Sequence, residues 1–390
     1  MTVTAPKGFR AAGVAAGLKQ AGLDVALIVN DGPDATAAGL FTTNRVKAAP
    51  VLWSQQVLRA GIVRAVVLNS GGANACTGPQ GFQDTHATAE YVAARLTASG
   101  GGRLVVGSAD VAVCSTGLIG ERLPMRKLLG GVDAAVRGLH RDGGLAAARA
   151  VMTTDTRPKT TVVAGQGWSV GGMAKGAGML APGLATMLCV LSTDAVVDSS
   201  ALDSALRQGT ALSFDRVDSD GCLSTNDTVL LLASGASGIS PTEGEFADAI
   251  TAACRDLALQ LLSDAEGSTK DIAIEVRAAA SEADAVEVGR AVARNNLVKT
   301  AIFGADPNWG RILAAVGTTA AEFEPDALAV AVNGIWVCRA GAAAEDRSKV
   351  DLSERAVHII IDLGAGSHAA TIWTNDLSVA YVHENSAYST

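Results

Sequence analysis

The sequence predicts a mixed fold, between α/β and α+β, with a smaller strand-rich domain at its C-terminal end. Strand-like and helix-like segments alternate through the first part of the chain, which is typical of proteins that mix helices and sheets. From residue 328 onward most segments are strand-like. This change predicts a second domain that begins near residues 270–280, within the two or three domains expected of 390 residues.

Short apolar runs predict the strands of the first half. They cover residues 24–30, 64–69, 104–106, 111–114 and 160–169. A helix is expected at 84–99, where Asp84 or Thr85 can cap the first turn, and an amphipathic helix at 124–137. A glycine-dense segment follows at 171–183.

The second half repeats this alternation before it becomes strand-rich. Strands are expected at 187–192, 228–233 and 272–278, and helices at 200–214, 243–264 and 281–298. The helix at 243–264 can pack Ile250, Leu257 and Leu261 inward, because helical spacing places them on one face. Further strands are expected at 330–332, 336–339, 357–363 and 369–374.

Composition indicates a globular chain with an aliphatic core. Hydrophobic residues make up 48% of the chain and aromatic residues only 4%, so Val, Leu, Ile and Ala must fill the interior. A net charge of −8 without a Lys/Arg stripe argues against nucleic-acid binding. No stretch approaches the roughly 18 apolar residues that a membrane span needs.

The cysteines and the N-terminus predict a cytoplasmic location. The cysteines form no CxxC pair and lie among small or apolar neighbours, which is typical of reduced core residues. They are Cys76, Cys114, Cys189, Cys222, Cys254 and Cys338. The first residues also lack the charged-then-apolar layout of a secretion signal.

The pair Ala185-Thr186 is a candidate for nucleophilic chemistry, because it lies between a glycine-rich approach and an apolar, strand-like run. The Thr186 hydroxyl there can attack the carbonyl of Ala185 and cut the chain. The α-amine of the new N-terminal threonine, with an ordinary pKa of about 7.7–8.0, can then act as the base for its own Oγ. Taken alone, the pair is more typical of a threonine that opens a buried strand.

Three further features suit acyl transfer, although each has an ordinary structural interpretation. Thr116-Gly117 follows a short strand, where a hydroxyl and a backbone N–H can point the same way, but Thr-Gly is also a common turn. Lys175 lies in a glycine-dense stretch that a substrate carboxylate can approach, although most lysines are solvated. Glu266 is expected at the end of a long helix, where the helix dipole disfavours an acid.

The sequence predicts no metal or cofactor site. The five histidines lack metal-ligand spacing, and the glycine-rich stretches match neither the phosphate-loop nor the dinucleotide pattern. Asp215, Asp218, Asp220 and Asp227 form an acidic cluster, but calcium-loop spacing fails because the twelfth position is Asn226. The turn-rich segment 306–311 is assigned no role.

Longer motifs occur in a fixed order along the chain. They are NSGGANACTG at 69–78, CSTGLIG at 114–120, MTTD at 152–155, GMAKGAG at 172–178, STND at 224–227, DAEG at 264–267, DPNWGR at 306–311 and ENSAY at 384–388. Together they resemble the bifunctional ornithine acetyltransferase/glutamate N-acetyltransferase family of arginine biosynthesis, whose precursor cuts itself at an Ala-Thr bond. The segment AAPVLW at 48–53 is similar to actinobacterial members.

This resemblance implies a layered α-β-β-α sandwich of the ornithine acetyltransferase/aminopeptidase type and a cut between Ala185 and Thr186. The fragments would be 1–185 and 186–390, associated as an α2β2 heterotetramer. Thr186 would be the nucleophile, and Thr116 and Gly117 would form the oxyanion hole. The implied substrate-binding residues are Thr153, Lys175, Thr186, Glu266, Asn385 and Thr390.

The implied reaction is acetyl transfer from N2-acetyl-L-ornithine to L-glutamate through an acetyl-threonine intermediate. No cofactor is implied, and acetyl-CoA is left open as a second acetyl donor. The residues alone leave two other classes open. One is a self-processing N-terminal-nucleophile amidohydrolase or aminopeptidase, and the other is a Gly/Ala-rich binding protein that is never cut.

Overall fold

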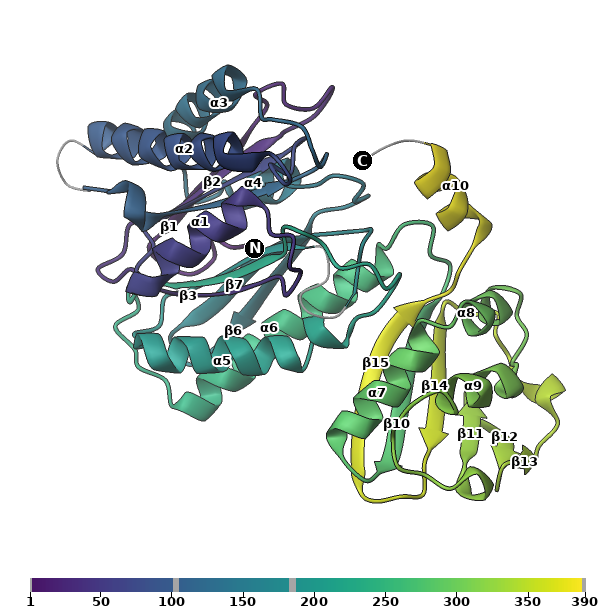
Figure 1. Ribbon diagram of the computed structural model, residues 1–390. Helices are drawn as coiled ribbons and strands as arrows, with labels where there is room; N and C mark the ends of the chain where they lie inside the picture. Colours follow the sequence, from purple (N-terminus) through teal and green to yellow (C-terminus); the bar gives the residue numbers. More distant parts are fainter. Residues whose placement is uncertain (1, 101–104, 182–186, 388–390) are drawn as a thin grey trace.

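Two stacked β-sheets form the centre of the larger domain (Figure 1). The computed structural model describes residues 2–100, 105–181 and 187–387. The first sheet has the order β1-β2-β4-β5, formed by β1 (Phe9–Val14), β2 (Val25–Asn30), β4 (Ala65–Ser70) and β5 (Val111–Thr116). The second has the order β3-β9-β8-β7-β6, formed by β3 (Thr36–Phe41), β9 (Thr228–Ala233), β8 (Leu188–Thr193), β7 (Ser169–Lys175) and β6 (Lys159–Ala164).

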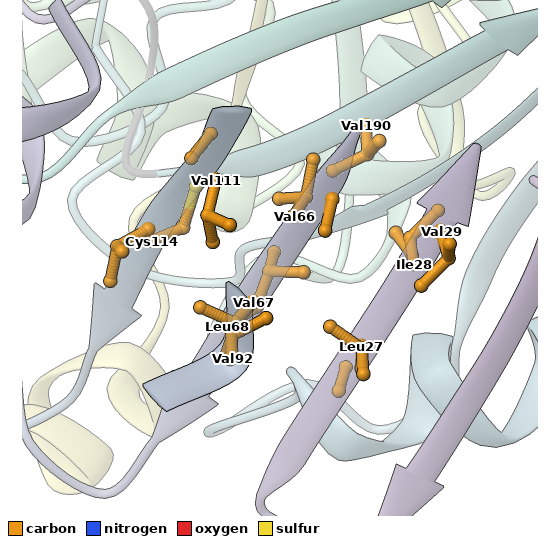
Figure 2. Packing of buried hydrophobic residues seen from close by; sticks show 14 of the residues in the cluster. Leu27, Ile28, Val29, Val66, Val67, Leu68, Val92, Val111, Cys114 and Val190 are labelled. Atoms are coloured by element: carbon orange, nitrogen blue, oxygen red, sulfur yellow. The ribbon is translucent and has the colours of Figure 1, made fainter. Parts of the chain in front are cut away.

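Five strands of these two sheets are buried on both faces. Every residue of β2, β4, β5, β8 and β9 is buried, as their nearly continuous apolar sequences predict. In β8, Leu188 and Val190 pack in the cluster between the two sheets, while Cys189 and Leu191 pack among the helices on the other side. Figure 2 shows part of the first cluster, with Val190 joining side chains of β2, β4 and β5.

Helices close both outer faces of these two sheets. They are α1 (Ala49–Val57), α2 (Gly78–Ser99), α3 (Met125–Arg137), α4 (Gly144–Ala150), α5 (Ser199–Ala211) and α6 (Glu243–Ser263). The first four pack on the first sheet, and α5 and α6 pack on the second. The order of layers in Figure 1 is therefore helix, sheet, sheet, helix, which confirms the expected α-β-β-α sandwich.

A third sheet and its helices form a separate layer pair at the C-terminal end (Figure 1). The sheet has the order β13-β12-β11-β14-β10-β15. Its strands are β10 (Asp271–Ala279), β11 (Ala329–Val332), β12 (Ile335–Arg339), β13 (Ala342–Ala343), β14 (Ala356–Asp362) and β15 (His368–Asn375). The helices are α7 (Glu282–Ala293), α8 (Asn296–Phe303) and α9 (Trp309–Val316), and the last helix, α10 (Val379–Ala387), leaves this domain and extends beside the sandwich.

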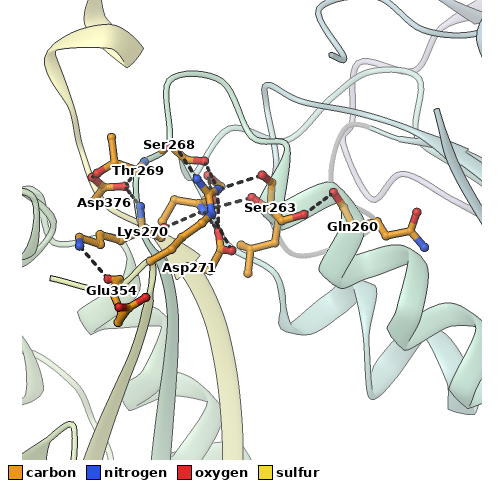
Figure 3. Close-up of polar contacts among 12 residues, drawn as sticks. Gln260, Ser263, Ser268, Thr269, Lys270, Asp271, Glu354 and Asp376 are labelled. Atoms are coloured by element: carbon orange, nitrogen blue, oxygen red, sulfur yellow. Dashed lines mark hydrogen bonds and ion pairs between the residues drawn. The ribbon is translucent and has the colours of Figure 1, made fainter. Parts of the chain in front are cut away.

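The loop between α6 and β10 is held at both ends by polar contacts (Figure 3). Asp376, which follows β15, accepts hydrogen bonds from the N–H groups of Thr269 and Lys270 at 2.8 Å each. Arg355 donates to Asp271 at 2.9 Å and to the Ser263 carbonyl at 2.8 Å, and so joins the end of α6 to the start of β10. This loop carries one of the site residues discussed below.

The predicted strand at 160–169 is a hairpin in the structure. β6 ends at Ala164 and β7 begins at Ser169, and the Gly165 N–H bonds the Trp168 carbonyl at 2.9 Å across the turn. Gly167 has a φ of +84°, which glycine adopts without strain. The glycine-dense segment after this turn is therefore partly strand β7.

Other predicted boundaries also differ. The helix expected at 281–298 is two helices, because Asn295 caps α8 by accepting two backbone N–H bonds. The helix expected at 84–99 begins at Gly78, so Asp84 and Thr85 lie buried inside α2 instead of capping it. The predicted helix at 200–214 ends at 211, and a separate turn, Phe214–Arg216, follows. Residues 105 and 106 form no strand, and residue 104 lies outside the described residues.

The remaining predicted segments are present, and some elements have no sequence signal. β2, β4, β8, β9 and α6 confirm the expected strands and helix within two residues at each end. Sequence periodicity does not predict β1, β3, α1, α4, α9 or α10, which are short. No helix in the described part of the chain is both long and apolar enough to cross a bilayer.

Candidate active site

Residues from distant parts of the chain line one small hollow beside the ends of two strands. Thr116 ends β5 of the first sheet, and Lys175 ends β7 of the second. The hollow measures about 90 Å³ and is lined by Thr116, Gly117, Thr153, Thr154, Lys175, Gly178, Met179, Glu266 and Asn385. The structure therefore brings together six of the residues that the sequence motifs single out.

Lys175 and Thr116 contact each other inside this hollow. Lys175 is only 3% exposed, and its Nζ lies 3.1 Å from the Thr116 Oγ1. A charged ammonium has no acceptor, so Thr116 must accept this hydrogen bond. The Thr116 hydroxyl can then donate its own hydrogen to another group, which is what an oxyanion hole requires.

Gly117 occupies a position that admits no side chain. Its φ is +124°, and a Cβ there would lie 2.6 Å from the Gly72 backbone nitrogen. The crowding arises because the Gly71 and Gly72 N–H groups both bond the Thr116 carbonyl at 3.0 Å. The NSGG motif therefore fixes the turn that presents Thr116 and Gly117.

Glu266 lies in the α6–β10 loop, three residues beyond the last residue of α6. The helix-end interpretation is therefore wrong for this residue. Its N–H bonds the Ala177 carbonyl at 2.9 Å, and Asn385 of α10 donates to its Oε2 at 3.0 Å. A Cβ on Gly178 would lie 2.6 Å from the same carboxylate oxygen, so glycine lets the loop approach. The C-terminal Asn385 thus belongs to an ordered helix that contacts the site.

A buried ionic network joins the chain segments that carry residues of the hollow. The Lys159 Nζ lies 2.5 Å from both Asp155 Oδ1 and Asp264 Oδ2, and 3.0 Å from the Gly176 carbonyl. Asp155 also accepts the Gly176 N–H at 2.7 Å and the Thr153 N–H at 2.9 Å. Lys159 and its two carboxylate partners therefore connect Thr153, the end of β7 and the residues just before Glu266.

Burial and neighbouring charges shift the pKa values of the site. Burial, the largest effect, lowers the pKa of Lys175 below its ordinary value, while Asp155 raises it. Burial by itself raises the pKa of Asp155, but the Lys175 and Lys159 ammoniums outweigh burial, and this pKa falls below its ordinary value. A bound carboxylate would stabilise the charged form of Lys175 in the same way.

Several sequence-predicted residues lie elsewhere or cannot be placed. Ala185, Thr186 and Thr390 lie outside the described residues. The segment 306–311 does not line the hollow: Asn308 caps α9, and Arg311 donates to the Leu297 carbonyl at 2.7 Å.

The carboxylates of the acidic cluster have separate partners in the structure. Asp218 pairs with Arg294 at 2.7 Å, and Asp220 accepts the Met179 N–H at 2.7 Å. Asp227 accepts the Met187 N–H at 3.1 Å.

Sequence reasoning missed Asp155, Lys159 and Asp264. Asp155 and Asp264 stand inside the MTTD and DAEG motifs, so motif membership is the signal that could have found them. Lys159 opens a strand and carries no comparable signal, because its partners lie 4 and 105 residues away in sequence. Its complete burial is visible only in the folded chain.

A family model and curated relatives of this chain share one description. A family model described as the ArgJ family matches residues 10–390. The "Arginine biosynthesis bifunctional protein ArgJ" of Streptomyces avermitilis is 65% identical over 390 residues, which cover 100% of both chains. The protein of the same name from Mycobacterium tuberculosis is 59% identical, over 99% of this chain and 96% of its own. A crystal structure of ornithine acetyltransferase complexed with ornithine, also from Mycobacterium tuberculosis, is 62% identical, covers 48% of this chain and 96% of its own, and has a TM-score of 0.45.

Replacing Lys159 by Met should destabilise the protein strongly, because Asp155 and Asp264 would remain buried without their cation. Removing one partner of a buried ion pair typically costs about 3–5 kcal/mol. Arg207→Met is the control, since the Arg207–Asp203 pair is exposed and should contribute less than about 1 kcal/mol. Chemical denaturation measures both free energies of unfolding, and equal small losses would contradict the role given to Lys159.

Proposed function

The chain belongs to the ArgJ family, and on that premise we propose that it transfers the acetyl group of N2-acetyl-L-ornithine to L-glutamate, giving ornithine and N-acetyl-L-glutamate in arginine biosynthesis. The observation that carries this proposal is that Lys175, Glu266 and Thr116 line one hollow. A cation, an anion and a hydroxyl donor therefore surround the space in which an acylated amino acid would bind.

Self-cleavage would create the nucleophile. The Thr186 Oγ adds to the carbonyl carbon of Ala185, the C–N bond between the two residues breaks, and the hydroxyl proton passes to the released amine. Water then hydrolyses the ester that joins Ala185 to the Thr186 Oγ. The Ala185 carboxylate remains on fragment 1–185, and Thr186 regains its hydroxyl at the start of fragment 186–390.

Acetyl transfer would use the same threonine. Its free α-amine takes the Oγ proton, Oγ attacks the acetyl carbonyl of the donor, and the ornithine amine leaves with that proton. The glutamate amine then attacks the acetyl ester and regenerates the Thr186 hydroxyl. Thr116 and Gly117 would stabilise the oxyanion of each step, and the loss of such a donor typically costs about 3–4 kcal/mol.

Both substrates share an α-amino-acid end, which the site would recognise by charge. Lys175 would pair with the carboxylate and Glu266 with a cationic group, with Thr153, Asn385 and Thr390 as further contacts. Glu266 also borders two larger hollows of about 400 and 370 Å³. These hollows would leave room for the different side chains of ornithine and glutamate.

The two fragments would stay associated after the cut, as an α2β2 assembly in the cytoplasm. Support comes from β8, which follows Thr186 and pairs with β7 on one side and β9 on the other. β7 belongs to fragment 1–185, while β8 and β9 belong to fragment 186–390. All residues of β8 are buried, so separating the fragments would break the central sheet.

The first prediction is that wild-type protein yields fragments 1–185 and 186–390, and that Thr186→Ala stays intact. The hydroxyl supplies the attacking atom, so its removal leaves no nucleophile at this bond. Denaturing electrophoresis and mass spectrometry over time measure the cut. A wild-type chain that remains full-length after long incubation would fit a binding protein and rule out the proposed chemistry.

The second prediction is ping-pong kinetics with an acetyl group trapped on Thr186. Donor and acceptor would use one site in turn, so double-reciprocal plots should give parallel lines. Release of acetate or an amino acid without glutamate would instead indicate an amidohydrolase or aminopeptidase. The same assay with acetyl-CoA as sole donor shows whether the enzyme accepts it.

The third prediction separates turnover from binding. Thr116→Ala should lower kcat with little change in KM, by about 100-fold or more, because its donor acts on the transition state. Glu266→Gln should raise KM for N2-acetylornithine about tenfold, equivalent to about 1.4 kcal/mol. Steady-state kinetics of the cut enzymes test both, and unchanged parameters for both variants would refute these roles.

A further inference from the structure

Two carboxylates from one segment bond the chain on either side of the proposed cut. The segment 217–227 connects the turn Phe214–Arg216 to β9. Within it, Asp220 lies against residues 179–180, upstream of the cut, and Asp227 lies against Met187, downstream of it. One piece of chain therefore contacts both arms of the segment that would be cleaved.

The upstream arm is fixed by Asp220 and its neighbour. Asp220 Oδ2 accepts the Met179 N–H at 2.7 Å, and the Ser219 N–H bonds the Leu180 carbonyl at 2.6 Å. Met179 has a φ of +57°, a left-handed conformation that costs free energy in a residue with a side chain. The contacts from 219–220 hold the arm in this unfavourable conformation.

The downstream arm is fixed by Asp227 and the start of β9. Asp227 is fully buried, and its Oδ1 accepts the Met187 N–H at 3.1 Å. The Thr228 N–H bonds the Met187 carbonyl at 3.1 Å, so both polar groups of the Met187 backbone are held. The Met187 N–H belongs to the same peptide unit as the Thr186 carbonyl, which brings this contact within one residue of the proposed nucleophile.

The second carboxylate oxygen of Asp227 takes no part in these contacts. Its Oδ2 is buried and has no hydrogen-bond partner among the described residues. Burial raises the pKa of this carboxyl well above its ordinary value, although the Met187 N–H and the Lys175 ammonium oppose the effect. An asparagine at this position keeps an acceptor oxygen for the Met187 N–H, whereas an apolar side chain would leave this N–H unbonded.

We propose that Asp220 and Asp227 are positioning residues for the self-cleavage, because they hold the described chain on both sides of the bond that would be cut. The inference rests on the proposed function, because it concerns the cut described there. Attack requires the reacting atoms to approach within about 3–3.5 Å, and a displacement of about 1 Å can cost about 100-fold in rate. Fixing both arms limits such displacements before the reaction begins.

The test is the rate of the cut in paired variants of the full chain. Asp227→Leu removes the acceptor and should slow the cut about 100-fold, while Asp227→Asn keeps an acceptor oxygen and should stay within about tenfold of wild type. Asp220→Ala and Asp220→Asn form a second pair, which still tests the positioning role if Asp227→Leu does not fold. Mass spectrometry of samples taken over time gives each rate.

Asp218→Asn is the matched control. Asp218 is buried in the same segment, but its side chain pairs with Arg294. This variant should be cut at the wild-type rate, even if its thermal unfolding temperature falls. A purely structural role for Asp220 and Asp227 predicts instead that the rate of the cut follows the unfolding temperature in every variant.

The outcomes distinguish this inference from the proposed function. If wild type is cut and the folded Asp227→Leu and Asp220→Ala proteins are cut equally fast, the positioning role is overturned and the proposed function stands. If wild type is not cut between Ala185 and Thr186, the proposed function itself fails. Slow cutting in these two variants, with rapid cutting in their Asn counterparts and in Asp218→Asn, supports the positioning role.

Discussion

The buried ammonium of Lys159 is the contact on which the geometry of the pocket depends. It joins Asp155, before β6, to Asp264, after α6, and Asp264 lies 105 residues beyond Lys159 in the sequence. Asp155 in turn bonds the backbone of Thr153 and Gly176. Burying three charged groups costs desolvation energy that their attraction repays only if the geometry is good. The network therefore contributes a defined arrangement of the pocket more than net stability.

In the proposed function, the burial of Lys175 would favour the binding of a charged ligand. Lys175 is buried beside Asp155, Asp227 and Glu266, and burial lowers its pKa even though these carboxylates raise it. A buried cation of this kind gains more from a ligand carboxylate than a solvated lysine would, because fewer waters compete. Glu266, in contrast, is half-buried at the edge of three hollows. The site thus combines an enclosed positive group with a more accessible negative one.

The architecture also explains how a chain could be cut and remain one protein. Both proposed fragments contribute strands to the second sheet, because β8 and β9 lie between β3 and β7. The pocket is shared in the same way: Thr116 and Lys175 precede the cut, while Glu266 and Asn385 follow it. Hydrogen bonds along the strands and the packing of helices on both faces hold these pieces together without a peptide bond.

Local sequence patterns determined most bounds of helices and strands and the candidate site residues, whereas tertiary contacts determined which distant residues pair. β9 has the predicted bounds because five of its six residues form a continuous apolar run, and α6 begins where Thr242 and Glu245 form a capping box. The motifs also predicted six site residues that the fold brings together: Thr116, Gly117, Thr153, Lys175, Glu266 and Asn385. They predicted a cut as well, at residues that lie outside the described part of the chain. The sequence could not show that Lys159 pairs with Asp264, or that Asp227 contacts Met187, because such pairs form between residues far apart in sequence. Periodicity and motif spacing describe neighbours along the chain, whereas burial, ion pairing and strand order depend on which distant segments the folded core brings into contact.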